Sequence, residues 1–300
     1  MRGAASRAAL SEQSGTQTPA HIQAIYQGLC LSCGVAMPAL IFRNLATRPG
    51  VLEAFWQCLG PLYKQGLLQQ SAWGLVWQAG TNDLLPALEA RELQAFGLQG
   101  GPMLGRALAT LDNYNRANPV NWLALLSLLQ AARRISTPDA THARPAAEPA
   151  WQPPMPPADE LLPLPAAQDL DARIRWLLND LREGDRSELD SVVPSLYRHL
   201  SACPGLIEWL HLHLAPRFAD GRMTAKLQSL RQAMQQEASG WAERLGPLPD
   251  ALLASDVLAT LEQFAGQVIP PMVLIGSSLR RAIGTGLDTG LDSSLKQRPL

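Results

Sequence analysis

The sequence predicts an all-α protein made of two helical repeats, related by a pseudo-twofold axis and joined by a long proline-rich linker. Leucine far outnumbers valine and isoleucine combined, and no stretch alternates apolar and polar residues for long enough to predict a strand. Residues 41–66 recur as residues 196–221 at a constant offset of 155, with eight of the 26 aligned positions identical. Average composition would give roughly one or two identities, so the chain carries one helical unit twice.

The repeat extends beyond this segment. Residues 108–134 match residues 258–284 at an offset of 150, through a shared Leu-Ala-Thr-Leu run and the pair Tyr114 and Phe264. Between the copies lies a stretch that holds nine of the 24 prolines and should be extended. The predicted organisation is a flexible N-terminus (1–18), repeat 1 (19–135), a linker (136–167), repeat 2 (168–284) and a flexible tail (285–300).

Each copy is expected to hold a short helix followed by a longer one. A Pro-Gly pair, at 49–50 and again at 204–205, separates the two, because proline favours an extended residue before it and suits the first helical turn. After it, apolar residues step by three or four positions along 51–63 in the first copy and along 223–241 in the second. That spacing predicts amphipathic helices with one buried face.

The motif YNRANP, from Tyr114 to Pro119, closes the first copy. Asn118 comes directly before Pro119, and Asn115 lies one turn earlier. Asparagine is a preferred N-cap and proline suits the first position of a helix, so this pair predicts a new helix that Asn118 caps.

Charge and cysteine content narrow the classes of partner. A net charge of -1 provides no overall positive field, so nucleic acid is not expected as a partner. Four cysteines are too few for a disulfide framework in this chain, which favours a reducing, cytoplasmic location. The N-terminus has no apolar segment of the signal type, and the longest apolar runs fall short of the ~18 residues that span a bilayer, so no membrane association is expected.

Cys30 and Cys33 form a CxxC motif, which can support dithiol redox chemistry at a helix N-terminus. The pair is similar to that of the helical alkylhydroperoxidase-like proteins, whose architecture would also suit this chain. Those proteins carry a glutamate and a histidine where this chain has Tyr26 and Met37. Without these proton-transfer groups, two small core residues are the simpler interpretation.

No metal site is expected from the histidines. His211 and His213 are two residues apart and would point away from each other on a helix, whereas helical metal pairs are three or four residues apart. Solvated or capping histidines are the simpler interpretation.

The duplicated, proline-linked helical chain, with FRNLATRPG at 42–50 and YNRANP at 114–119, resembles the group I (DehI-type) 2-haloacid dehalogenases over nearly its whole length. The resemblance implies an all-α subunit, commonly forming homodimers, with the active site in a channel between the repeats. It implies hydrolysis of a 2-halocarboxylate such as 2-chloropropionate, with no metal or organic cofactor. An aspartate and an asparagine of the family activate water, which attacks the α-carbon directly and expels halide with inversion.

Carried over residue by residue, the resemblance gives one match and one departure. Asn118 matches the family's asparagine. The aspartate should directly follow Ser195, but that position holds Leu196, so a displaced acid such as Asp190 or Glu188 would have to act as the general base. The candidate site is Asn118 and Asp190 as catalytic residues, with Tyr114, Asn115, Ser195, Leu196 and Phe264 in contact with substrate.

Three functions are therefore open from the sequence. The first is a hydrolase acting on carbon–halide bonds through Asn118 and a displaced acid such as Asp190. The second is a non-catalytic relative that binds a small 2-substituted carboxylic acid between the repeats. The third is a thiol redox protein that uses Cys30 and Cys33.

Overall fold

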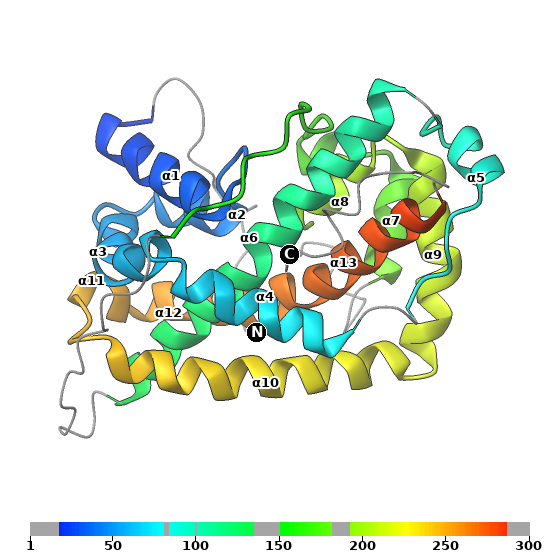
Figure 1. The fold of residues 1–300 in the computed structure, drawn as a ribbon. Coiled ribbons are helices and arrows are strands. Elements are labelled where there is room, and N and C mark those ends of the chain that lie inside the picture. The colour runs from blue at the N-terminus through cyan, green and yellow to red at the C-terminus, as the bar shows by residue number, and fades with distance from the viewer. Residues whose placement is uncertain (1–17, 81–83, 100, 135–150, 182–192, 287–300) are drawn as a thin grey trace, which may run out of the picture.

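The computed structural model describes residues 18–80, 84–99, 101–134, 151–181 and 193–286 (Figure 1). Every regular element in these ranges is helical, which confirms the predicted all-α class for the described chain. The elements are α1 (Ala20–Cys33), α2 (Leu40–Leu45), α3 (Val51–Lys64), α4 (Leu67–Ala79), α5 (Ala90–Ala95), α6 (Pro102–Arg134), the 3₁₀ turn η1 (Ala167–Asp169), α7 (Ala172–Asp180), α8 (Ser195–Leu200), α9 (Pro204–Ala219), α10 (Arg222–Arg244), α11 (Asp250–Leu253), α12 (Ser255–Gln263), the π turn η2 (Phe264–Val268) and α13 (Ile269–Gly286). Most of the two predicted flexible ends and the first part of the predicted linker lie outside the described residues.

Helix α6 runs diagonally across the molecule, with α10 along the lower edge in this view (Figure 1). It packs against α4, α10 and α13, and most of its 33 residues are buried. Leucine-rich residues 123–129 account for much of this burial. Leucine favours the helix and stabilises the fold by about 1.5–3 kcal/mol for each side chain buried, so α6 forms the centre of the core.

Helix α6 continues through Pro119, so the expectation that Asn118 caps a new helix there is wrong. A proline inside a helix lacks the N–H that would bond to the carbonyl four residues earlier, here that of Asn115, at a cost of about 3 kcal/mol. The helix continues because the segments on both sides of Pro119 are buried against other helices, and a break would expose them. Asn118 therefore projects from the middle of a long packed helix.

Local structure recurs at the offset of 155. Helices α2 and α8 have equivalent bounds at this offset, and α4 and α10 begin at equivalent residues. The residues before them, Gly66 and Gly221, both have left-handed backbone, with φ of 72° and 81°, which glycine adopts without strain. The Pro-Gly pairs differ, because Gly50 precedes α3 with φ of 78° whereas Pro204 is the first residue of α9. The division into two repeats remains a prediction, which the recurrence supports.

The predicted apolar faces of the longer helices are confirmed. In α3 the expected side chains are buried except that of Trp56, which is partly buried. In α10 the buried side chains include the whole predicted stripe, namely Met223, Leu227, Leu230, Met234, Ala238 and Trp241. These two faces close the core on either side of α4.

The described part of the predicted linker, from Trp151 onward, is extended and lies against α6 and the end of α1 (green in Figure 1). The Trp151 ring lies 5.9 Å from that of Trp73, and Arg116 of α6 donates a 2.6 Å hydrogen bond to the carbonyl of Met155. Farther along, Leu162 is buried, with 2% of its surface exposed. This half of the linker is therefore part of the folded structure.

One helical stretch, Ser255–Gly284, is long and apolar enough to cross a membrane by length and composition, with a mean hydropathy of 1.2. However, 61% of its most apolar window is buried inside the protein, and α13 packs along α6. It has the surroundings of a core helix.

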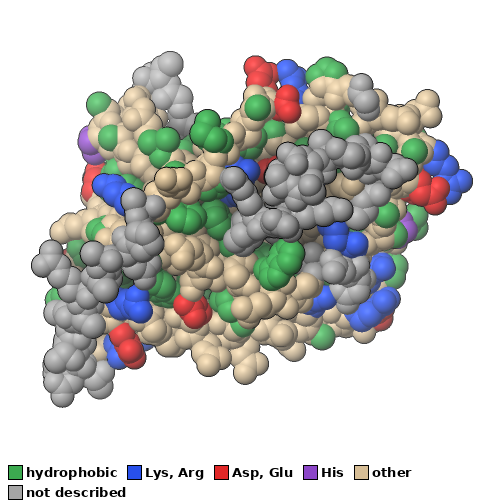
Figure 2. Space-filling view, viewed as in Figure 1, with side chains coloured by type: hydrophobic (Ala, Val, Ile, Leu, Met, Phe, Trp, Pro, Cys, Tyr) green, Lys and Arg blue, Asp and Glu red, His purple; other side chains and the backbone are tan. Residues whose placement is uncertain are grey.

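Figure 2 shows charged side chains of both signs scattered over this face, among hydrophobic and uncharged side chains. This distribution agrees with the net charge of -1.

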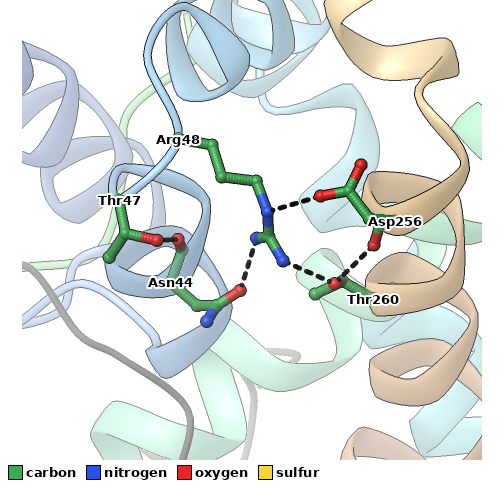
Figure 3. Close-up of polar contacts among 5 residues, drawn as sticks. All are labelled: Asn44, Thr47, Arg48, Asp256 and Thr260. Carbon is green, nitrogen blue, oxygen red and sulfur yellow. Dashed lines mark hydrogen bonds and ion pairs between the residues drawn. The ribbon is translucent and has the colours of Figure 1, made fainter. Parts of the chain in front are cut away.

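Arg48 joins the end of α2 to α12 (Figure 3). Its guanidinium donates hydrogen bonds of 3.0 Å each to the Asp256 carboxylate, the Asn44 side-chain oxygen and the Thr260 hydroxyl. The Thr260 hydroxyl in turn donates to the Asp256 carbonyl at 2.8 Å. Since the guanidinium is planar and its donors are fixed, these contacts set the position of α2 relative to α12.

Replacing Arg48 by methionine should lower the free energy of unfolding by about 1–3 kcal/mol, because it removes three hydrogen bonds between packed elements. Urea denaturation measures this change. Arg91 provides the control, since its ion pair with Glu89 is exposed (80% and 61% for the two side chains). Arg91→Met should change the free energy by less than about 0.5 kcal/mol. Equal effects of the two substitutions would contradict the role given to Arg48.

Candidate functional site

A small cavity, here called the central pocket, lies where α2, α6, α8 and the π turn meet. Its lining residues are Ala39, Leu40, Ile41, Tyr114, Asn118, Pro194, Ser195, Leu196, Phe264, Val268, Ile269 and Met272. Its volume is about 30 Å³. A cavity of this volume has room for only a few water molecules in this conformation.

Most lining residues form pairs at the two offsets found in the sequence. The pairs at 155 are Ala39 and Pro194, Leu40 and Ser195, and Ile41 and Leu196, and those at 150 are Tyr114 and Phe264, and Asn118 and Val268. Segments related by these two offsets therefore supply equivalent positions to the walls, as the predicted pseudo-twofold axis would require.

The structure brings together five of the residues expected from the sequence, and they are Tyr114, Asn118, Ser195, Leu196 and Phe264. Asn115 lies behind the wall, where its side-chain nitrogen donates to the Gly276 carbonyl at 3.2 Å. A β-carbon on Gly276 would lie 2.4 Å from the Asn115 side-chain oxygen and 3.5 Å from the Leu196 side chain, so these three residues are packed together. Asp190 and Glu188 lie outside the described residues.

The polar groups of the pocket are an amide, a hydroxyl and a phenol. The Asn118 side chain is 7% exposed and has no hydrogen-bond partner among the described residues, so its amide is available to a ligand. The Ser195 hydroxyl accepts a long hydrogen bond of 3.4 Å from Arg43, which is 5% exposed. A buried positive charge therefore lies directly behind Ser195, where it would favour an anionic ligand.

No aspartate or glutamate occurs among the described residues that line the pocket. Leu196, at the position where the resemblance requires an aspartate, is 1% exposed and makes part of the wall. A leucine side chain cannot accept a proton. The described lining therefore has polar groups that could contact a ligand but provides no carboxylate that activates water.

His199 is a buried group beside the pocket that the sequence reasoning did not place there. It lies one turn after Ser195 on α8, is 2% exposed, and its ring meets the Tyr114 ring edge-on at 5.7 Å. Its Nδ1 is hydrogen-bonded to the Leu162 carbonyl, so Nδ1 carries the proton. Burial lowers the pKa of His199 to about 4, against the opposing effect of the backbone hydrogen bonds. The signal in the sequence was its spacing of four residues from Ser195, which places both on one helix face.

The π turn is the second feature that the sequence reasoning missed. Phe264 and Val268, its first and last residues, both line the pocket. A π turn holds one residue more than an α turn, which bulges the backbone, and such turns are frequent at functional sites. The signal in the sequence was the double proline at 270–271, which removes two successive backbone donors.

The CxxC pair lies in the last turn of α1, at the opposite end of a helix from the one that stabilises a thiolate. Burial raises the pKa of Cys30 to about 12 and also raises the pKa of Cys33. Both thiols are therefore protonated at neutral pH, which disfavours dithiol chemistry.

The described histidines and acids do not gather into a metal site. No group of three metal-binding side chains occurs in the part of the chain that the structure describes. His211 is paired with Asp180 at 2.8 Å, and the ring of His213 lies 4.6 Å from that of Trp209. These two histidines therefore have structural contacts.

The fold should lose stability as the pH falls from about 6.5 toward 4. In that window an unfolded chain protonates His199, whereas the folded state keeps it neutral because its pKa is lowered to about 4. The unfolded state binds more protons there, so its free energy falls relative to that of the folded state. His199→Asn should reduce the difference in unfolding free energy between pH 7.5 and pH 5, measured by urea denaturation. An unchanged difference would show that His199 does not titrate in this way.

Cys30 should react slowly with iodoacetamide at pH 8, at least roughly tenfold more slowly than glutathione, because a raised thiol pKa leaves little thiolate. Peptide mass mapping after timed alkylation gives the rate at this residue. A rate equal to that of glutathione would restore the thiol redox hypothesis for the CxxC pair.

No protein-family model and no curated protein matches the sequence. The fold matches that of a D-2-haloacid dehalogenase mutant in complex with D-2-CPA, with a TM-score of 0.67 and 15% identity over 94% of this chain and 97% of that one. It also matches a D-2-haloacid dehalogenase with L-LA (TM-score 0.62, 17% identity, 92% and 94% covered) and a further mutant (TM-score 0.63, 16% identity, 92% and 94% covered). At these identities the likeness concerns the fold, and this chain has the helical fold of the D-2-haloacid dehalogenases.

Proposed function

We propose that this protein is a dehalogenase-like binding protein, which holds a small 2-substituted carboxylic acid without hydrolysing it, in the central pocket once that pocket has widened around the ligand. The Asn118 amide and the Ser195 hydroxyl, backed by the buried charge of Arg43, suit a carboxylate. The apolar walls suit the carbon chain and its substituent. No metal or organic cofactor is part of the proposal.

The observation that carries the proposal is the apolar Leu196 in the pocket wall. Attack of neutral water on a saturated carbon requires a general base. The base must reach the attacking water by a direct hydrogen bond or through one further water molecule. His199 is neutral, but it lies behind Tyr114 and is not among the lining residues. The proposed ligand would therefore be bound and released unchanged.

Hydrolysis of 2-haloacids is the second candidate. It is favoured by the free Asn118 amide in the pocket and by the shared fold. It requires a base from outside the described lining, for which Asp190 is the candidate. A homodimer and a cytoplasmic location remain predictions in either case, as does the absence of nucleic-acid or membrane partners.

Binding is tested by thermal denaturation with D- and L-2-chloropropionate and with propionate. The proposal predicts a rise in melting temperature without halide release, because a ligand that binds only the native state stabilises it. No shift with any of these acids would refute the binding function. Halide release that is lost in Asp190→Ala would establish the hydrolase instead.

Leu196→Asp should confer halide release from 2-chloropropionate, because it places a carboxylate in the wall that Asn118 lines. A positioned general base contributes typically 10²–10⁴-fold, so the rate should exceed that of the control Leu196→Asn by about that factor. The control has nearly the same shape but no base, and circular dichroism verifies that both variants are folded. A folded Leu196→Asp variant without activity would show that more than the base is missing.

A further inference from the structure

A groove of about 900 Å³ lies between α10, the last turns of α6 and the π turn. Its lining residues are Trp122, Leu126, Leu129, Gln130, Arg133, Arg231, Gln232, Gln235, Gln236, Ser239, Glu262, Ala265 and Gly266. Apolar side chains come from α6, and the wall from α10 is polar. The groove is large enough for a small organic acid in this conformation, whereas the central pocket would have to widen to admit one.

The groove and the central pocket are separated by the π turn. Phe264 and Val268 line the pocket, while Ala265 and Gly266 of the same turn line the groove. The two spaces are also neighbours along α6, where Asn118 lines the pocket and the residue one turn later lines the groove. A movement of the π turn would therefore connect them.

A side chain from α10 holds this turn in place. Pro270 and Pro271 have no N–H, so the Gly266 carbonyl lacks both its α-helical and its π-helical backbone partner. Arg231 donates a 3.0 Å hydrogen bond to that carbonyl. The bond lies on the groove side of the turn and is exposed, so solvent or an anion can compete for the guanidinium.

The charges of the groove favour anions. Its lining holds Arg133, Arg231 and Glu262, an excess of one positive charge. Arg133 is paired with Glu262 at 3.2 Å. The side chains of Gln232 and Gln236 add amide donors along the same wall. A small carboxylate would be drawn into such a groove.

We propose that this groove is the vestibule through which a small carboxylate reaches the central pocket, and that the π turn, held by Arg231, is its gate. The proposal rests on the proposed function, since it takes the central pocket as the ligand site. It adds the route of access and the group that controls it. A local displacement of the π turn would open the route, as short segments do in other gated sites.

A cysteine placed in the central pocket measures how fast a reagent reaches the pocket. The measurement does not require that the pocket bind the reagent. In Ser195→Cys, the alkylation rate of the new thiol is measured by peptide mass mapping with iodoacetate and with iodoacetamide, which match in size but differ in charge. Failure of the proposed function would leave this assay intact, because the reaction needs only arrival at the pocket.

Obstruction of the groove is the first arm. A β-carbon at Gly266 would meet no atom within 4 Å, and Gly266 lines the groove, so a tryptophan there would project into the vestibule and obstruct it. Gly266→Trp in the Ser195→Cys background should slow both reagents at least about fivefold, an effect of about 1 kcal/mol on the barrier. Gly240 is an equally open glycine on α10 outside the groove, and Gly240→Trp should leave both rates unchanged. Equal rates in the two variants would overturn the assigned route.

Release of the gate is the second arm. Arg231→Met removes the hydrogen bond to Gly266 and one positive charge, so iodoacetamide should react faster while the ratio of iodoacetate to iodoacetamide rates falls. Arg222→Met removes the same charge near the start of α10 and should change neither quantity. No increase in the iodoacetamide rate for Arg231→Met would overturn the gate, and an unchanged ratio would overturn the role of the charge in the vestibule.

Discussion

The contact of Arg48 with α12 determines how the two walls of the central pocket stand relative to each other. Its hydrogen bonds to Asn44 and Thr260 are both 3.0 Å long and join α2 to α12. Helix α2 supplies one wall, and α12 leads directly into the π turn that supplies the facing wall. Because a guanidinium presents its donors in a fixed plane, it fixes both a distance and an orientation, which a flexible lysine would not.

Periodicity and repetition in the sequence were enough to predict the helical class and the buried faces of α3 and α10, because both follow from side-chain spacing alone. The course of the chain at prolines could not be predicted in the same way. Pro119 lies inside α6, and Pro270 follows a π turn without ending the helix. In both places burial of long flanking segments outweighs the loss of one or two backbone hydrogen bonds, and that balance depends on tertiary packing.

The candidate site, too, could be predicted from the sequence only in part. Asn118 and Leu196 were identified from motif and repeat, and both line the pocket. The place of Arg43 behind Ser195 and that of His199 beside Tyr114 depend on how α2, α6 and α8 pack, which no local pattern encodes. The neutral state of His199 likewise results from burial by the folded linker and the surrounding helices.

The paired residues of the pocket differ in polarity at some positions and agree at others. In three pairs one member is polar and the other apolar, namely Leu40 and Ser195, Tyr114 and Phe264, and Asn118 and Val268. The equivalent elements therefore carry side chains of different polarity into the same pocket. At the pair Ile41 and Leu196 both members are apolar and almost fully buried. The one position that the resemblance assigns to the base therefore matches its apolar counterpart at the other end of the offset, while three other pairs have become polar on one member.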